Sequence, residues 1–273
     1  MIVHVRGLDI HVVMNGEDHL PTIVLLHGFT GSTTTWQETM NLLAGKCRTV
    51  AIDLTGHGKT TAPEDYIRYA MAEQVVDLEE LFERLALDSF MLVGYSMGGR
   101  VALAYTTRYP ARVSSLILES SSPGLRTEEA RASRREADSR LADRMVEEGL
   151  PAFIDFWESI PLFATQKTLS LERRQAVRKE RLSQRVNGLA NSLRGIGTGS
   201  QPSYWKALET VQVPVLLITG ELDTKFVTIA REMINEFQNV RHETIEHAGH
   251  AIHVEKPLTF VTMIEKHILK SEN

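Results

Sequence analysis

Short apolar runs that alternate with longer amphipathic stretches are the feature of this chain that most constrains its fold. The apolar runs lie at 23–26, 49–52, 91–93, 115–118 and 215–219. Runs without polar alternation are typical of parallel strands that are buried on both faces. Stretches with apolar residues at helical spacing lie at 71–85, 100–109 and 228–236. This pattern predicts an α/β fold with a mostly parallel, doubly wound sheet.

Two segments depart from this rhythm. Segment 2–14 alternates polar and apolar residues and contains a glycine at its middle, which predicts an antiparallel hairpin at the edge of the sheet. Between about 122 and 205 no buried strand is expected, and the sequence is helical, highly charged and rich in arginine. We therefore expect a helical cap at 122–205, inserted between two parts of an α/β core at 1–121 and 206–273.

Composition excludes several classes of protein. The net charge of −5 over 273 residues argues against a nucleic-acid or anionic-membrane partner. No signal peptide is visible, and no apolar run approaches the ~20 residues that cross a bilayer. The single cysteine, Cys47, excludes an internal disulfide, and we expect it to be structural rather than a nucleophile. These features predict a cytoplasmic protein without a membrane anchor, as a monomer or small homo-oligomer.

A Gly-Tyr-Ser-Met-Gly motif at 94–98 lies between an apolar run and a helical stretch. A strand, a sharp turn and a helix in this order form a nucleophile elbow, which exposes the serine at the end of a buried sheet. The glycines leave room for the strained turn. A serine hydroxyl becomes a nucleophile or base only when a neighbour takes its proton, so Ser96 requires a histidine and an orienting carboxylate.

The partners of Ser96 are expected later in the chain, acid first and histidine second. Asp223 follows the apolar run at 215–219, where ligands bind at the carboxyl ends of parallel strands. Glu221 is the alternative acid, less favoured because it is closer to the end of the strand. His250 follows an Ala-Gly turn and is the expected base. His247 and His253 compete with it.

An oxyanion hole needs two backbone N–H groups aimed at the developing negative charge. One is expected from Met97, directly after the serine, and the other from Phe29 in the loop that follows the run at 23–26. His27 is expected to brace that loop. The histidines are scattered and show no metal-ligand spacing, so we expect neither a metal nor a cofactor.

Several motifs together resemble the α/β-hydrolase superfamily over nearly the whole chain. They are His-Gly-Phe at 27–29, Asp-Leu-Thr-Gly-His-Gly at 53–58, the motif at 94–99, Asp223, and Gly-His at 249–250. Thr55 departs from the superfamily, in which proline is common at this position. It lies away from the proposed triad and is expected to change only the stiffness of the loop.

Three further stretches resemble a narrower family, the 2-succinyl-6-hydroxy-2,4-cyclohexadiene-1-carboxylate (SHCHC) synthases of menaquinone biosynthesis. They are an arginine four residues after Ser96, a Ser-Pro-Gly-Leu sequence at 122–125, and Asp-Thr-Lys-Phe at 223–226. The resemblance implies a lyase that eliminates pyruvate from 2-succinyl-5-enolpyruvyl-6-hydroxy-3-cyclohexene-1-carboxylate. It also implies that Ser96 is the immediate base for a proton beside the succinyl ketone, and that no acyl-enzyme forms.

A substrate with three carboxylates needs cationic partners, and arginine provides them in bidentate geometry. Arg100 lies one helical turn after Ser96 and can therefore border the pocket. The resemblance adds Arg134, Arg181 and Trp157 from the cap as substrate-binding residues. The alternatives are surface arginines paired with nearby acids, which is the expectation for most cap arginines, and an ordinary core position for Trp157.

Two other functions remain open from the residues. A serine hydrolase of the same fold, either a carboxylesterase or a C–C bond hydrolase, would form a trappable acyl group on Ser96. A receptor or binding protein that keeps the fold would hold a small molecule without turnover.

Overall fold

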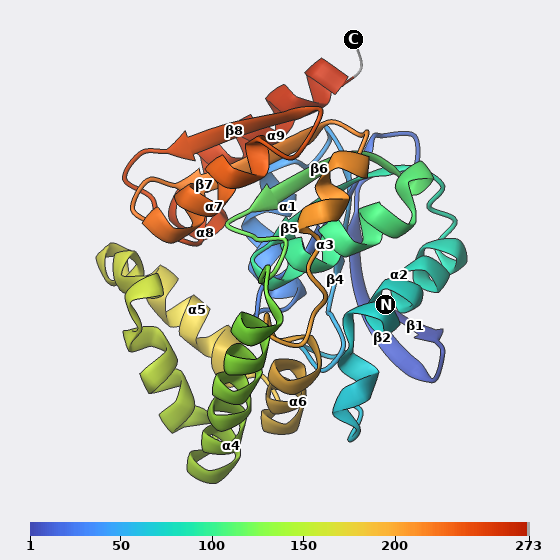
Figure 1. Cartoon of the computed structure of the whole chain (residues 1–273). Coiled ribbons are helices and arrows are strands. Elements are labelled where there is room, and N and C mark those ends of the chain that lie inside the picture. The colour runs from blue at the N-terminus through green and yellow to red at the C-terminus, as the bar shows by residue number, and fades with distance from the viewer. Residues whose placement is uncertain (272–273) are drawn as a thin grey trace.

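A single eight-stranded sheet forms the centre of the computed structural model, which describes residues 1–271 (Figure 1). Its strand order is β1-β2-β4-β3-β5-β6-β7-β8. The strands are β1 (Ile2–Val5), β2 (Leu8–Asn15), β3 (Thr22–Leu26), β4 (Arg48–Ile52), β5 (Phe90–Tyr95), β6 (Val113–Glu119), β7 (Val215–Gly220) and β8 (Val240–Ile245). Strands β3 to β8 pair in parallel, so the predicted doubly wound α/β fold is confirmed.

The predicted hairpin is formed by β1 and β2, which pair antiparallel with Val5 opposite Leu8. At the other edge, β8 is a strand that the sequence analysis did not identify. Its sequence, Val-Arg-His-Glu-Thr-Ile, contains no apolar run because, among the described residues, β8 pairs only with β7 and buries a single residue, Ile245. An edge strand of this kind carries no signal of burial on two faces.

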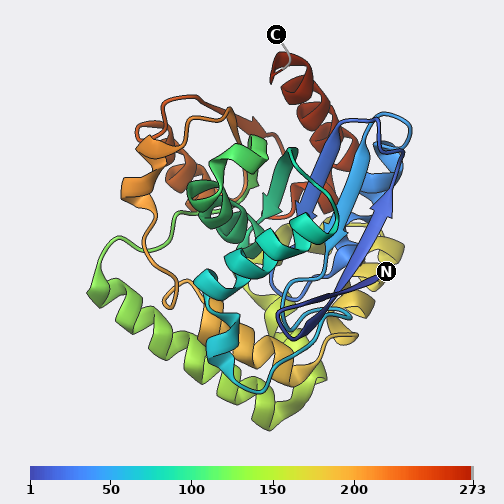
Figure 2. The same cartoon turned by 90° about the vertical axis from the view of Figure 1, so that its right-hand side faces the viewer.

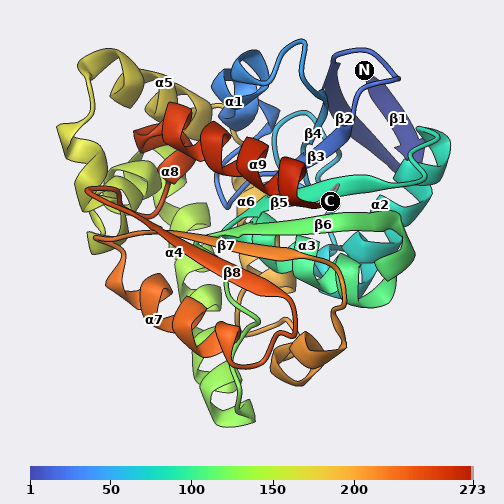
Figure 3. The same ribbon diagram turned by 90° about the horizontal axis from the view of Figure 1, so that it is seen from above.

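Helices cover both faces of the sheet, as the view from above shows (Figure 3). On one face lie α2 (Met71–Arg84), α3 (Met97–Arg108) and α7 (Thr224–Ile234). On the other lie α1 (Gln37–Leu42), α8 (Ile252–Glu255) and α9 (Pro257–Ser271).

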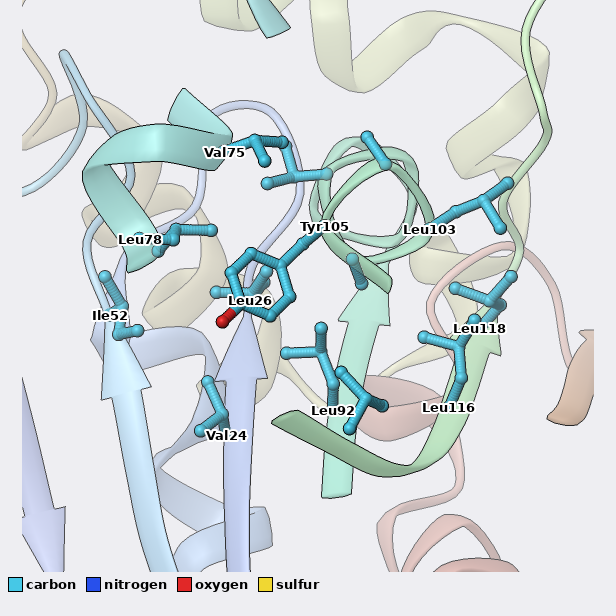
Figure 4. Packing of buried hydrophobic residues seen from close by; sticks show 14 of the residues in the cluster. Val24, Leu26, Ile52, Val75, Leu78, Leu92, Leu103, Tyr105, Leu116 and Leu118 are labelled. Atoms are coloured by element: carbon cyan, nitrogen blue, oxygen red, sulfur yellow. The ribbon is translucent and has the colours of Figure 1, made fainter. Parts of the chain in front are cut away.

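Successive residues of each central strand point to opposite faces of the sheet. In β5, for example, Leu92 packs beneath α2 and α3, whereas Val93 packs toward α1 and α9. Figure 4 shows the first of these layers, with Leu26 and Leu92 from the strands facing Tyr105 of α3. This double burial explains why the central strands are apolar without alternation.

The segment between β6 and β7 contains helices and, among the described residues, no strand. The α-helices are α4 (Glu128–Ser159), α5 (Leu171–Leu182) and α6 (Val186–Ile196), with the 3-10 helix η4 (Pro161–Thr168) after α4. They lie together below the sheet, with α4 along the edge of the molecule (Figures 1 and 2). The boundaries at 122 and 205 stay a prediction.

The path of α4 depends on a kink at Gly149, whose φ of 80° is outside the helical region. Pro151 follows in the next turn and has no N–H to continue the helical bonding. The kink lets Phe153 turn back onto Leu189 of α6, so that the cap has its own apolar cluster. None of the helices in the described part of the chain is long and apolar enough to cross a membrane.

Candidate active site

Ser96 occupies a strained turn between β5 and α3. Its φ is 50° and its ψ is −105°, a backbone conformation that residues other than glycine rarely adopt. The backbone N–H of Ser96 donates to the carbonyl of Glu119 at 2.8 Å, which fixes the turn to the neighbouring strand. A Cβ at Gly98 would collide with the carbonyl oxygen of Leu26, so only glycine allows α3 to start this close to the sheet.

Ser96, His250 and Asp223 form a hydrogen-bonded relay. His250 Nε2 lies 3.0 Å from Ser96 Oγ, and His250 Nδ1 lies 2.6 Å from Asp223 Oδ2. The carboxylate accepts a hydrogen bond from the Nδ1–H group, which leaves Nε2 unprotonated and able to take the proton of the serine hydroxyl. Asp223 follows β7, and His250 lies in the loop between β8 and α8. Both side chains are buried, so water competes little with the hydrogen bond between them.

The three competing side chains make other contacts. The Glu221 carboxylate accepts the backbone N–H of His247 at 3.0 Å, and the His247 side chain is 82% exposed. His253 is buried and its Nδ1 donates to the carboxylate of Glu119 at 2.8 Å. The structure therefore brings Asp223 and His250 to Ser96, and leaves these three outside the relay.

The two expected oxyanion donors, Phe29 and Met97, both line the cavity above Ser96. Within the described residues, neither backbone N–H donates to a protein acceptor. His27 holds the Phe29 loop as expected: its Nε2 accepts the N–H of Leu54 at 3.0 Å, and its Nδ1 donates to the carbonyl of Gly28 at 2.8 Å. Burial lowers the pKa of His27, which keeps the imidazole neutral and able to accept at Nε2.

A cavity of about 920 Å³ lies over Ser96 and His250, between the core and the cap. Its cap side is aromatic, with Trp157 and Phe163 among the lining residues. Trp157 packs edge-on against Phe29 with ring centroids 5.4 Å apart, and Phe163 lies 6.1 Å from the His250 ring. The structure thus places Trp157 in the cavity wall rather than only in the cap core.

Among the described residues, three arginines and a lysine line the cavity, namely Arg100, Arg126, Arg134 and Lys225, and these side chains differ in their partners. Arg126 pairs with Glu232 at 3.3 Å, and Arg134 pairs with Asp138 at 2.8 Å. Arg100 and Lys225 have no carboxylate within 4 Å in the described part of the chain. Two positive charges in the cavity wall are therefore not neutralised by a protein anion.

Arg100 is the more deeply buried of these two, with 9% of its surface exposed. Its Nη1 donates to the carbonyl oxygen of Ile196 at 2.7 Å and to Gln201 Oε1. Burial, together with the positive charge of the nearby Arg134, lowers the pKa of Arg100 to about 10. The group remains cationic at neutral pH. A buried cation without an anionic partner is expensive in a protein interior, and such a group is typical of an anion-binding site.

Arg181 does not reach the lining of the cavity. It is buried between Glu158, at 3.3 Å, and Gln166, at 3.0 Å, and its guanidinium lies over the Phe163 ring. The substrate-binding role expected from the resemblance is therefore not visible in this arrangement. Other cap arginines form pairs with nearby acids, as expected: Arg131 and Arg135 with Glu128, Arg140 with Glu136, and Arg144 with Glu148.

The sequence analysis did not assign Lys225, Phe163 or Gln201 to the site. Lys225 had a usable signal, because it lies two residues after Asp223 at the start of α7. No sequence signal pointed to Phe163 or Gln201, since their positions depend on the kinked path of the cap. No cluster of three or more potential metal ligands occurs among the described residues.

Comparison with known proteins finds close relatives. A family model of the alpha/beta hydrolase fold matches residues 21–257. A Bacillus subtilis protein provisionally named as an SHCHC synthase is 44% identical, with 95% of this chain and 94% of that protein aligned. The SHCHC synthase of Salmonella agona is 34% identical over 89% of this chain and 92% of its own length. The solved structure of MenH from S. aureus is 35% identical and superposes with a TM-score of 0.92, covering 96% of this chain and 99% of MenH.

Proposed function

This chain belongs to the α/β-hydrolase family and, within it, to the SHCHC synthases, and on that premise we propose how it acts as a lyase of menaquinone biosynthesis. Its reaction is the elimination of pyruvate from 2-succinyl-5-enolpyruvyl-6-hydroxy-3-cyclohexene-1-carboxylate. The product is SHCHC.

One observation carries this proposal. Arg100, a buried guanidinium without a carboxylate partner, lines the same cavity as the Ser96–His250–Asp223 relay. An esterase for neutral substrates gains nothing from this charge, whereas a substrate with three carboxylates provides the missing anion. Lys225 adds a second positive charge on the α7 side of the cavity, and Arg134, which pairs with Asp138, lies on the cap side.

The relay supports proton abstraction from carbon. In the proposed first step, His250 Nε2 takes the proton of the Ser96 hydroxyl, and Ser96 Oγ takes the proton from the ring carbon beside the succinyl ketone. The electron pair of that C–H bond moves onto the ketone oxygen as an enolate. Asp223 stabilises the imidazolium that forms, through its 2.6 Å bond to Nδ1.

The enolate oxygen is the point where negative charge develops. We expect the backbone N–H groups of Phe29 and Met97, two residues that line the cavity, to donate to it. As the enolate collapses to the ketone, a C2–C3 double bond forms, the ring double bond moves from C3–C4 to C4–C5, and the C5–O bond breaks. The leaving group departs with that electron pair as the enolate of pyruvate. This anion takes a proton from the His250 imidazolium and becomes pyruvate, which restores the neutral relay without any bond between substrate and serine.

The test is to supply the enolpyruvyl cyclohexene substrate and to follow pyruvate release with lactate dehydrogenase. We expect rapid release by the wild-type protein and no covalent adduct on Ser96 by intact mass. In parallel, short-chain p-nitrophenyl esters test the hydrolase alternative. Fast ester turnover with an acyl-Ser96 adduct, and no pyruvate from the cyclohexene substrate, would show that the protein is a serine hydrolase and not a lyase.

A further inference from the structure

Arg100 joins the core to the cap through neutral acceptors only. Its side chain rises from α3 of the core to the carbonyl of Ile196, the last residue of α6, and to the side-chain amide oxygen of Gln201. The carboxyl end of a helix carries a partial negative charge, which attracts a cation but does not neutralise it. The guanidinium is thus held firmly while most of its charge remains uncompensated.

Gln201 is itself held in one orientation. It is 1% exposed, and its backbone N–H donates to the carbonyl of Gly197 at 3.1 Å in the turn after α6. Its Nε2 lies against Gly124, where a Cβ would come within 2.5 Å of that nitrogen. The φ of Gly124 is +92°, and its carbonyl accepts the indole N–H of Trp205 at 2.9 Å. This packing directs the Gln201 amide oxygen toward Arg100.

We propose that Gln201 is a positioning residue that orients Arg100 without neutralising it, so that the full guanidinium charge is left for a carboxylate of the substrate. The inference rests on the proposed function, since it assumes an anionic substrate. It gives a physical reason for glutamine at this position. A glutamate has the same shape and would make a stronger bond to Arg100, but it would cancel the charge that the substrate needs.

The other charged groups around Arg100 do not supply this neutralisation. Asp138 attracts it, but neither oxygen of that carboxylate lies within 4 Å of the guanidinium, and Asp138 Oδ1 accepts from Arg134 Nε at 2.8 Å. The positive charge of Arg134 opposes that of Arg100 more than Asp138 favours it. Among the described residues, a carboxylate at position 201 would therefore be the only anion in direct contact with Arg100.

The first experiment compares Gln201→Glu with the wild-type protein in the pyruvate-release assay. We expect KM to rise at least about tenfold, with a smaller change in kcat, because a charge-assisted bond to substrate is lost. The melting temperature should stay equal or rise, because the new carboxylate pairs with Arg100. Gln201→Met removes the acceptor without adding charge and should raise KM by only about threefold. A merely structural role for Gln201 would instead lower the melting temperature in both variants and leave KM unchanged.

Gln175→Glu is the control for adding one negative charge to the cap. Gln175 is exposed on α5 and does not line the cavity, so the KM of the Gln175→Glu variant should match the wild-type value. Equal KM values for Gln201→Glu and Gln201→Met would overturn the proposal, because added charge would then have no effect of its own.

A binding experiment separates this inference from the proposed function. Calorimetry with 2-succinylbenzoate, the stable aromatic counterpart of the product, needs no turnover. We expect Gln201→Glu to bind it at least about tenfold more weakly than the wild type. If that difference appears but wild-type protein releases no pyruvate, the proposed function fails and the Gln201 inference stands. Equal affinity in both proteins, or no binding by either, would overturn the inference.

Discussion

Replacing Arg100 by methionine should affect substrate binding and stability differently. The buried charge of the wild-type residue lowers the stability of the fold, whereas the same charge binds the substrate in the proposed site. Methionine keeps most of the apolar stem of the side chain and removes its charge. The folded protein holds the pKa of Arg100 at about 10, below the ordinary value of 12.5, mainly through burial. That difference corresponds to a cost on the order of 3 kcal/mol in the free energy of unfolding at pH 7.

The sign of this cost follows from the two pKa values. Below pH 10 the guanidinium is charged in both states, and the unfolded chain solvates it better, so the full cost is present at pH 7. It shrinks only as the pH rises from about 10 toward 12.5. Methionine removes the cost but leaves the Ile196 carbonyl and the Gln201 amide oxygen without this donor, which offsets about 1–3 kcal/mol. We therefore expect a change within about 2 kcal/mol, or about 5 °C in melting temperature.

Catalysis should respond far more strongly than stability. Loss of charge-assisted bonds to one substrate carboxylate is worth about 3 kcal/mol, so kcat/KM for pyruvate release should fall about a hundredfold. Calorimetric melting and the coupled lactate dehydrogenase assay measure the two effects. Arg140→Met is the matched control, because Arg140 lies on α4, pairs with Glu136 and does not line the cavity. A kcat/KM within threefold of wild type, or a melting temperature more than about 10 °C lower, would refute the reasoning.

Three further predictions concern the relay and a buried histidine. Ser96→Ala should lower kcat for pyruvate release at least several hundred-fold, and a loss below tenfold would exclude Ser96 as the base. Asp223→Asn should lower kcat at least about a thousandfold, because its amide N–H₂ can donate to His250 Nδ1 and favour the tautomer protonated at Nε2. Burial lowers the pKa of His57 to about 3, so its contribution to stability is lost as the pH falls from 6.5 toward 3. Urea unfolding should show that the free energy of unfolding of His57→Gln falls by about 2–3 kcal/mol less than that of the wild type between pH 6.5 and 4.5. Parallel pH profiles of the two proteins would contradict this.

Local sequence was enough to predict the central sheet and the position of the nucleophile. The strands β3 to β7 are recognisable because burial on two faces requires continuous apolar residues, and the elbow because its glycines meet the backbone of neighbouring strands. Asp223 and His250 could be selected because the carboxyl ends of parallel strands meet at one edge of the sheet. Strand β8 was not predicted because only one of its residues, Ile245, is buried.

By itself, the sequence determined the α/β core, the helical character of the cap and the order of the relay residues, because these depend on local periodicity and on fold topology. Only the tertiary structure decided which cap residues meet the relay. The kink at Gly149 and the turn after α6 place Trp157 in the cavity, keep Arg181 out of it, and bring Gln201 to Arg100. The physical reason is that contacts between the cap and the core join residues that lie a hundred or more positions apart in the sequence, such as Arg100 and Gln201 or Ser32 and Glu180. No local sequence pattern shows whether a buried arginine will pair with a carboxylate or will bond to neutral acceptors, as Arg100 does among the described residues.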